Sequence, residues 1–318
     1  ATGGRNSEAL ASQIQFVGRY ILQSMKFLIG ILFLFLFSLG QVIYKGNVTD
    51  SKTKQAIPFA SVALSKENIG TNADEEGNFF LESWRNLLAD SLVISCVGYK
   101  LKVIPITESR YYNIELEERS IQLEQVNIIS KEKWNVERLN ILSECGNIGI
   151  TTDGSHTQVA KYFSSSFPNA ILTEIEICKK KYFSSRKAKF RIRIYDIDTV
   201  TRAPSVDLCD EVIEVNSSKK SIILNLEKYK IHIPSKHFFV AVEWLKIPEN
   251  VNKYKITDQN GKEEDKITYR PSIGGQLLEN YNLDKSKMLF EVWQLNYQNT
   301  WVPMRPFSNI SIIATVKY

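Results

Sequence analysis

Three histidines are the first residues in this sequence that could bind a metal or transfer a proton. A zinc peptidase site needs a His-x-x-Glu pair and a distant third ligand, which together leave one coordination position open for water. None of His156, His232 and His237 is followed by Glu at the third position. His232 and His237 flank Pro234-Ser235 and could meet across a turn, yet no third ligand is evident. We therefore expect no metal site.

A serine nucleophile and a nucleotide-binding loop are not indicated either. The sequence has no Gly-x-Ser-x-Gly elbow, and Ser165, Ser185 and Ser217 lie in polar, loop-like runs. It also lacks the glycine patterns that cradle phosphates or dinucleotides. The acidic run Asp74–Asn78 does not have the spacing of a calcium loop, so we interpret it as a solvated hairpin turn. We expect no catalytic residue and no cofactor.

Aromatic residues near the C-terminal end are the candidate ligand contacts. Tyr281, Trp293, Tyr297 and Trp301 fall within one stretch, and Trp293 and Tyr297 share the same strand parity. An exposed flat row of rings would stack on sugar rings or on a partner protein, whereas rings of this kind more commonly pack in a core. The sequence leaves both interpretations open.

Basic residues form a second candidate surface. Lysines and arginines gather between Lys179 and Lys189, where they would touch an anionic glycan or lie solvated at the end of a hairpin. The net charge of +5 over 318 residues is mild. No nucleic-acid-binding motif occurs, so we expect no nucleic-acid partner.

The elements that must position these side chains begin with a strand-rich stretch from Gln41 to about Ser130. Short apolar runs alternate there with Gly, Asn and Asp clusters and show no helical period. Ile114–Glu117 alternates apolar and acidic residues, as a half-buried strand does. This pattern predicts a small antiparallel β-sandwich.

The same stretch resembles the carboxypeptidase-regulatory-like domain, which is common in secreted and outer-membrane proteins of Bacteroidetes. The landmarks, in order, are Gly46 in the first strand, the run Ile57–Val62, Gly70-Thr71, the turn Glu76–Phe79 and the strand Ser95–Lys100. The resemblance implies a seven-strand transthyretin-like or immunoglobulin-like sandwich over residues 41–130. In its family the domain is an accessory module without catalytic residues, so the resemblance implies a fold and no activity.

The segment before this domain has the form of a signal peptide over residues 25–40. Met25 and Lys26 precede the apolar run Phe27–Phe37, and the small residues Ser38 and Gly40 follow. No Cys lies near the junction, which argues against a lipoprotein anchor. Residues 1–24 would lie upstream of the natural start.

An uncleaved membrane anchor over residues 21–39 is the alternative to a signal peptide. The apolar run is shorter than the roughly 20 residues that a bilayer span needs. We therefore expect cleavage, no transmembrane span afterwards, and export to the periplasm, the outer-membrane surface or the extracellular space.

The remaining chain is predicted to form a linker and a second β domain. Residues 131–145 place Trp134 and Leu139 among charges, which favours a short linker helix. Over residues 146–318, about eight strand patterns with long loops, one of them at 248–264, predict a jelly-roll-like sandwich. The run Phe238–Leu245 is apolar apart from Glu243, which predicts a central strand. The predicted fold class is thus all-β.

Two alternating stretches in this second domain predict a hairpin. Residues 171–179 and 187–195 each have apolar residues on one face and charged residues on the other. One register matches both faces because opposite charges then lie across from each other. It pairs Glu174 with Arg193 and Glu176 with Arg191.

Four cysteines in an exported chain raise the question of disulfides. Cys96, Cys145, Cys178 and Cys209 match no metal or disulfide framework by spacing. The sequence favours four separate thiols, with one bridge such as Cys178–Cys209 as the alternative.

Taken together, these features predict a non-enzymatic, exported envelope protein. The first sandwich would be a spacer or docking module, and the second an interaction or glycan-contacting domain for an envelope protein or polysaccharide. The alternatives are a secreted hydrolase with a loop-built site in the C-terminal domain, and an accessory subunit of an outer-membrane transport assembly.

Overall fold

The computed structural model describes residues 26, 42–83, 90–119, 134–140, 145–180, 187–259, 261–277, 291–305 and 307–318. The chain divides into one compact unit of residues 1–43 and 82–87 and a second unit containing the rest. Few residues of the first unit are described, so the account below concerns the second. The predictions for residues 1–24, for the signal peptide apart from Lys26, and for 120–133 lie outside the described residues.

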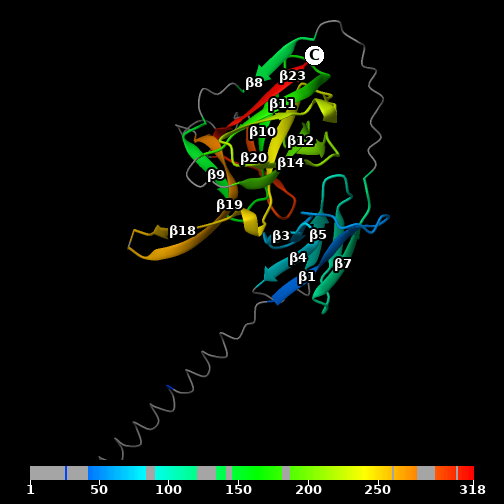
Figure 1. The fold of residues 1–318 in the computed structure, drawn as a ribbon, viewed down its shortest axis with the longest axis vertical. Coiled ribbons are helices and arrows are strands. Elements are labelled where there is room, and N and C mark those ends of the chain that lie inside the picture. Colours follow the sequence, from blue (N-terminus) through cyan, green and yellow to red (C-terminus); the bar gives the residue numbers. More distant parts are fainter. Residues whose placement is uncertain are drawn as a thin grey trace, which may run out of the picture. The chain divides into compact units, whose positions relative to one another are not determined.

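The described chain is nearly all β, as predicted (Figure 1). Lys26 is helical, and within the described residues from 42 onward the only regular helical elements are two short 3-10 turns, η2 (Glu227–Tyr229) and η3 (Pro248–Asn250). The described residues form no helix that has the length and apolar character to span a membrane.

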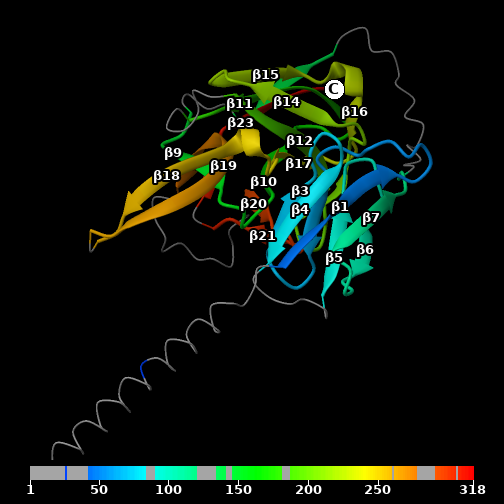
Figure 2. The same ribbon diagram turned by 60° about the horizontal axis from the view of Figure 1, so that its bottom comes forward.

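The first sandwich consists of a three-stranded sheet, β4-β1-β7, and a four-stranded sheet, β3-β2-β5-β6 (Figure 2). Its strands are β1 (Val42–Asp50), β2 (Ser61–Leu64), β3 (Gly70–Asn72), β4 (Asn78–Ser83), β5 (Ser91–Ser95), β6 (Lys102–Pro105) and β7 (Tyr111–Leu116). This confirms the predicted seven-strand sandwich. Strand β7 alternates exposed and buried residues along its length, as its sequence predicts.

Gly46 explains why the first strand carries a glycine. Strands β1 and β7 pair in parallel, with Gly46 opposite Tyr112, so the prediction of an antiparallel sandwich is wrong for this pair. A Cβ atom on Gly46 would lie 1.8 Å from the carbonyl oxygen of Tyr112. Any larger residue would push the two strands apart, because Cβ atoms do not tolerate such a contact.

The second sandwich has a seven-stranded sheet facing a five-stranded sheet. The larger sheet has the order β13-β12-β17-β10-β20-β21, with β14 also on β12, and the smaller has the order β15-β11-β23-β8, with β16 also on β11. The strands of the larger sheet are β10 (Gln158–Ser164), β12 (Ala188–Ile197), β13 (Pro204–Asp207), β14 (Ile213–Ser217), β17 (His237–Trp244), β20 (Val292–Leu295) and β21 (Trp301–Pro303). Those of the smaller are β8 (Val136–Leu139), β11 (Ala170–Cys178), β15 (Ser221–Asn225), β16 (Ile231–Ile233) and β23 (Ile312–Lys317).

Strand β17 is central, as predicted, because it pairs with β12 on one side and β10 on the other. Phe238, Val240 and Val242 point into the core between the two sheets. Phe239 and Ala241 belong to a smaller buried cluster on the opposite face. Burial on both faces accounts for the nearly continuous apolar run in this strand.

A further sheet joins β18 (Val251–Thr257), β19 (Glu263–Leu277), β22 (Phe307–Ile310) and β9 (Ile148–Thr152). Strands β18 and β19 form a long hairpin, which is seen in both ribbon views. The prediction of a loop over 248–264 is therefore wrong for residues 251–257. Their polar composition reflects a hairpin whose side chains are mostly half-buried or exposed.

The predicted hairpin between 171–179 and 187–195 is wrong. Strand β11 pairs with β15, β16 and β23, whereas β12 pairs with β13, β14 and β17, so they lie in different sheets. The apolar faces of both strands meet across the core instead of side by side. Their charged faces find other partners: Glu176 pairs with Arg138, and Arg193 pairs with Asp207.

The predicted linker helix is also wrong for the residues that the structure describes. Val136–Leu139 forms β8, which pairs with the C-terminal strand β23. Leu139 is buried in the core of the second sandwich. The apolar residues of this segment have a spacing that fits a helix, but pairing with the distant strand β23 determines the structure that forms.

A disulfide joins Cys145 to Cys178, while Cys96 and Cys209 are free thiols. The expectation of four separate thiols and the alternative Cys178–Cys209 bridge are both wrong. The bridge follows from strand order: β9 pairs with β19, and Lys179 bridges to Ile273 of the same strand. Residues before β9 and after β11 thereby come together.

Candidate functional site

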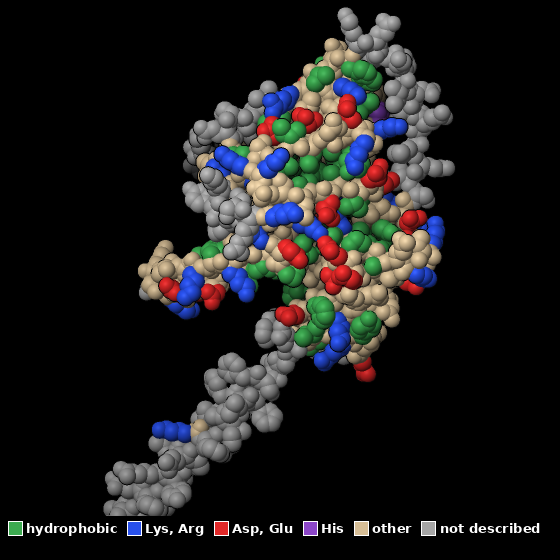
Figure 3. Space-filling model, in the orientation of Figure 1, with side chains coloured by type: hydrophobic (Ala, Val, Ile, Leu, Met, Phe, Trp, Pro, Cys, Tyr) green, Lys and Arg blue, Asp and Glu red, His purple; other side chains and the backbone are tan. Residues whose placement is uncertain are grey.

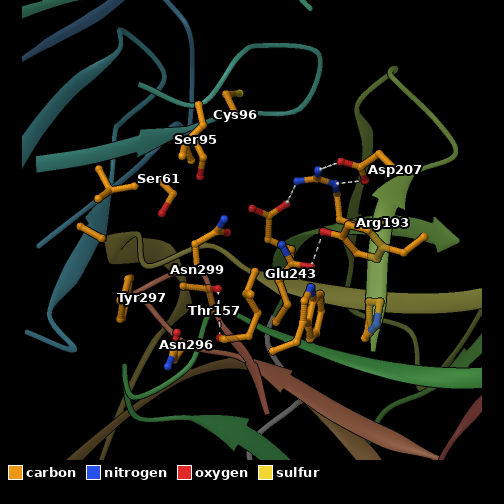
Figure 4. A pocket seen from close by; sticks show the side chains of 18 of the residues that line it. Ser61, Ser95, Cys96, Thr157, Arg193, Asp207, Glu243, Asn296, Tyr297 and Asn299 are labelled. Atoms are coloured by element: carbon orange, nitrogen blue, oxygen red, sulfur yellow. Dashed lines mark hydrogen bonds and ion pairs between the residues drawn. The ribbon is translucent and has the colours of Figure 1, made fainter. Parts of the chain in front are cut away.

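A cavity of about 310 Å³ lies between the first and second sandwiches (Figure 4). One wall is the outer face of β2 and β5, where Ser61 is the register partner of Ser95 and Ala63 that of Val93. Strand alternation turns these residues away from the first core, which takes Val62 and its neighbours instead. The opposite wall comes from β10, β12, β13 and β17 and from the loop after β20.

A buried ion-pair network forms the charged part of the second wall. Arg193 of β12 donates from Nε to Asp207 Oδ1 over 3.1 Å and also binds Asp207 through Nη2. Its Nη1 lies 3.5 Å from Glu243 Oε2. The side chains of all three residues are at most 12% exposed. Figure 4 shows this network facing the serines of the first sandwich across the cavity.

Burial governs the protonation of the groups in this wall. It raises the pKa of Asp207, against the opposing effect of the Arg193 and Arg119 charges. It also raises the pKa of Tyr195, whose hydroxyl stays protonated and donates to Gln158 Oε1 over 2.8 Å. Glu243 Oε2 is buried and accepts no hydrogen bond from the described residues.

Arg191, which lies on the same strand as Arg193, connects the two walls by hydrogen bonds. Its Nη2 donates to the carbonyl of Pro58 over 2.8 Å, and its Nη1 donates to that of Phe59 over 3.3 Å. Its guanidinium lies over the Phe59 ring. Phe59 itself packs in a small buried cluster with Leu245 and Ile247 of the second sandwich.

A second set of contacts joins the residues around β3 to the second sandwich. Asn68 accepts from the backbone N–H of Tyr297 over 2.9 Å and donates to the carbonyl of Ser155 over 2.6 Å. Lys246 donates from its backbone to Asn72 and from Nζ to the carbonyl of Gly70, both over 2.8 Å. The loops around β3 are thus bonded directly to the second sandwich.

The predicted aromatic contacts divide into three groups. Tyr297 and Trp301 line the cavity, whereas Trp293 does not and packs with Tyr195 and its neighbours. Trp293 is 7% exposed and Tyr297 5% exposed, so they do not form a flat exposed row. Tyr281 lies outside the described residues.

The histidines do not converge. His156 is buried with its ring against Trp244, His237 contacts the Tyr162 hydroxyl through Nδ1 over 2.6 Å, and His232 lies on β16 in the smaller sheet. None of the three lines the cavity. Within the described ranges no three His, Cys, Asp or Glu side chains are grouped to hold a metal.

Two lysines of the predicted basic surface are buried or paired with another residue and are not free at the surface. Lys179 is fully buried and donates to the carbonyl of Ser217 over 2.7 Å. Lys189 pairs with Glu75 of the first sandwich. Residues 181–186 lie outside the described ranges. On the face drawn in Figure 3, basic and acidic side chains are interspersed.

The residues that sequence reasoning missed are Arg193, Asp207 and Glu243 as a group. One signal was present: Glu243 interrupts an otherwise apolar strand, and a buried charge needs a partner. The partner could not be named, because Asp207 and Glu243 reach Arg193 from two strands on opposite sides of β12.

The fold and the site define a class of protein, an all-β chain in which a seven-strand sandwich and a larger sandwich enclose a polar cavity. The family model of the CarboxypepD_reg-like domain matches residues 44–128. The first sandwich is therefore a domain of this family, which confirms the resemblance seen in the sequence. No curated protein matches the chain.

Several solved structures are similar to the chain. The clostridial cysteine protease Cwp84, after propeptide cleavage, is 15% identical with a TM-score of 0.35, and the match covers 57% of this chain and 40% of that one. The cysteine protease and lectin-like domains of Cwp84 from Clostridium difficile give 15% identity, a TM-score of 0.29, and coverage of 51% and 32%. The chain thus spans less than half the length of both.

A Bacteroides fragilis protein described as membrane-associated and of unknown function is 11% identical with a TM-score of 0.20. The match covers 87% of this chain and 96% of that one. TM-scores as low as these carry no argument about the function of this chain, so the proposals below rest on its own residues.

Proposed function

We propose that the chain is a non-enzymatic, exported envelope protein that binds an envelope component in the cavity between its two sandwiches. The first sandwich docks onto the second and supplies one wall of the site. The second sandwich supplies the charged wall and the aromatic side chains.

The cavity is the observation that carries this proposal. Its volume of about 310 Å³ lies at the lower end of the roughly 300–1,000 Å³ of small-molecule sites. Its walls combine Ser61 and Ser95 from one sandwich with Gln158 and Asn299 from the other. Polar groups that converge from two domains on a concave site are typical of ligand recognition.

The disulfide supports export. Bridges such as Cys145–Cys178 form and persist in oxidising compartments and are rare in reducing ones. The basic start and apolar run of residues 25–40 favour the same route. Both features favour the envelope or the extracellular space as the place of action.

A hydrolase is the second candidate, because two buried carboxylates, Asp207 and Glu243, lie on one wall of the cavity. General acid catalysis would require one of them to deliver a proton. Arg193 forms ion pairs with both, and its charge opposes the burial that raises the pKa of Asp207. No histidine lines the cavity to act as an alternative base. The arrangement therefore favours binding over bond cleavage.

Thermal stabilisation by separated envelope fractions tests the proposal. A fraction that contains the ligand should raise the Tm of the purified protein, because binding to the native state alone stabilises it. The variant Ser95→Trp fills the cavity and should lose this shift. Asn113→Trp, on the exposed outer face of β7, is the matched control and should keep it.

Two results would contradict this proposal. One is an equal Tm shift for wild type and Ser95→Trp, which would place the ligand elsewhere. The other is turnover of a fraction by the wild type that Asp207→Asn or Glu243→Gln abolishes, which would establish the hydrolase.

A further inference from the structure

We infer that the cavity recognises an uncharged sugar residue, hydrogen-bonded by both sandwiches at once. The inference rests on the proposed function and specifies the chemical class of its ligand. Three properties of the walls carry it: their charge balance, their unused hydrogen-bonding groups and their aromatic side chains.

The charges of the cavity already neutralise one another. Arg193 is shared by Asp207 and Glu243, and Arg119 lies 2.9 Å from Asp210 and 3.8 Å from Asp207. The third cation of the lining, Lys100, lies 3.1 Å from Glu117. An anionic ligand would meet the two carboxylates, and a cationic ligand would meet the two guanidinium groups. Either would add an unpaired charge to a desolvated network, which is costly. An uncharged ligand avoids this cost.

The neutral groups are those that a sugar can satisfy. Within the described chain, the Ser61, Ser95 and Asn299 side chains form no hydrogen bond with another residue, and Gln158 uses only its oxygen, which accepts from Tyr195. Glu243 Oε2 accepts no hydrogen bond there either. A sugar hydroxyl both donates and accepts hydrogen bonds. Neighbouring hydroxyls of one sugar can therefore bind the carboxylate, the amide and the serine hydroxyls at the same time.

The aromatic side chains provide the apolar part of the site. Tyr297 and Trp301 line the cavity, and the Trp301 ring stands edge-on to Tyr195 with 5.4 Å between centroids. Rings with one apolar face and a polar surround suit the C–H faces of a sugar.

A peptide fits these walls less well. Peptides commonly add a strand to an exposed sheet edge or fill an apolar groove. The wall strands β2, β5, β10, β12 and β17 each have neighbours on both sides, and the edge strand of this wall, β13, has four residues and begins with Pro204. Few aliphatic side chains line the cavity.

Ligand-observed NMR and calorimetric titration with defined probes test the inference. The neutral probes are the methyl glycosides of glucose, galactose, mannose and N-acetylglucosamine, each with short neutral oligosaccharides of the same sugar. The charged probes are glucuronic acid and glucosamine. We expect at least one neutral sugar to bind, and its charged counterpart to bind roughly tenfold more weakly or worse. Tighter binding of the oligosaccharide would identify a polysaccharide as the source.

The variants locate the binding. Ser95→Trp, on the first sandwich, and Asn299→Ala, on the second, should each weaken the neutral sugar, whereas Asn113→Trp should not. Asn299→Ala also covers the case in which Ser95→Trp does not fold.

Equal or tighter binding of a charged sugar would overturn the inference, as would sugar binding that neither cavity variant changes. If no sugar binds at millimolar concentration while an envelope fraction still gives a Tm shift that Ser95→Trp removes, the inference fails and the proposed function stands. If neither probe nor fraction acts, both fail.

Discussion

Gly70 and Tyr297 show how closely the two sandwiches approach at a single residue. A Cβ on Gly70 would lie 2.0 Å from Tyr297 Cδ1. The Tyr297 ring is buried and lines the cavity. Because the same ring contacts Gly70 and lines the cavity, a change in the packing of the two sandwiches at this point would also change the shape of the cavity.

We expect Gly70→Ala to destabilise the protein by about 1–3 kcal/mol, the usual cost of overpacking, and to weaken ligand binding by displacing the Tyr297 ring. Urea unfolding measures the first effect and probe titration the second. Combining Gly70→Ala with Tyr297→Leu should recover part of the lost stability, because the smaller side chain makes room. Strictly additive losses in the double variant would show that the two residues do not press on each other.

Burial of His156 makes the stability of the folded protein depend on pH. Burial lowers the pKa of this histidine to about 4, against a smaller opposing effect of Asp153. Its Nε2 has no hydrogen-bond partner among the described residues, and its ring stands edge-on to Trp244 at 5.4 Å. The folded protein thus holds the neutral form.

Because the pKa of His156 is lower in the folded than in the unfolded chain, acid should favour unfolding. The stabilisation is complete above the unfolded pKa of about 6.5 and is lost as the pH falls towards 4, by an amount on the order of 3 kcal/mol. We expect His156→Phe to flatten the dependence of the unfolding free energy on pH in this window. His232→Gln, at a half-buried site where burial also lowers the pKa of the histidine, should flatten it less. Parallel curves for wild type and His156→Phe would refute the assignment.

Single residues were predicted with mixed success. The landmark glycines and the buried apolar side chains of β7 and β17 follow from local spacing, which the sequence displays directly. The site residues do not, since Arg193, Asp207 and Glu243 come from three strands and meet only in the folded sheet. Trp293 and Tyr297 were recognised as candidates, but their parity does not say which sheet face is covered.

At the scale of elements, the disulfide fixes the start of β9 to the end of β11. Cys145 and Cys178 are 33 residues apart in the sequence. The bridge lies beside the contact between Lys179 and β19. It therefore fastens the sheet of β9 and β19 to the smaller sheet of the second sandwich.

Removing this bridge should cost about 3–4 kcal/mol, because the unfolded chain regains the freedom of the closed loop. The variant is Cys145→Ser with Cys178→Ser, measured by urea unfolding in the absence of reductant. Dithiothreitol should bring the wild type to the stability of this variant and leave the variant unchanged. Cys209→Ser, which removes a free thiol, should behave as the wild type. Insensitivity of the wild type to reductant would argue against the bridge.

Strand existence was easier to predict than strand pairing. Alternation located β7, β11 and β12, and a nearly continuous apolar run located β17, which is buried on both faces. It could not show that β11 and β12 face each other across a core. Two strands with the same alternation of apolar and charged residues can be neighbours in one sheet or can lie in two sheets that face each other, and the alternation is the same in both cases. Likewise, β8 is short and depends on its partner β23, which no local pattern reveals.

For the whole molecule, the interface between the sandwiches should make them unfold together. Arg191 is 2% exposed and donates to two carbonyls of the first sandwich. Phe59 adds apolar contact with Leu245 and Ile247. Domains joined by such buried contacts share their stability.

We expect a single calorimetric transition for the wild type and two separate transitions for Arg191→Met. The substitution leaves the carbonyl of Pro58 without its donor, whereas that of Phe59 still accepts from Asn72 Nδ2 over 3.3 Å. An unsatisfied buried group costs about 1–3 kcal/mol. Lys255→Met, which removes an exposed ion pair with Glu263, is the control, since such pairs contribute little. Two transitions in the wild type, or one in Arg191→Met, would contradict this account.

The all-β organisation was predictable because each sandwich has its own pattern of strands and turns. The association of the sandwiches was not, because it depends on side chains such as Arg191 and Asn68 that meet carbonyls and amides far away in the sequence. The cavity exists only through that association, which is why the sequence pointed to aromatic residues and missed the charged wall.

The spacing of Arg191 and Arg193 on β12 has a consequence for the history of such chains. Arg191 donates hydrogen bonds to the carbonyls of Pro58 and Phe59, and Arg193 lies in the cavity wall. One strand therefore carries both the contact between the sandwiches and part of the site. A recombination event that replaced the first sandwich with a related copy would have to preserve residues 58–72, which contain β2 and β3, or the new arrangement would lose both the Arg191 hydrogen bonds and the cavity. Modules of this kind are expected to be inherited as a pair rather than exchanged singly.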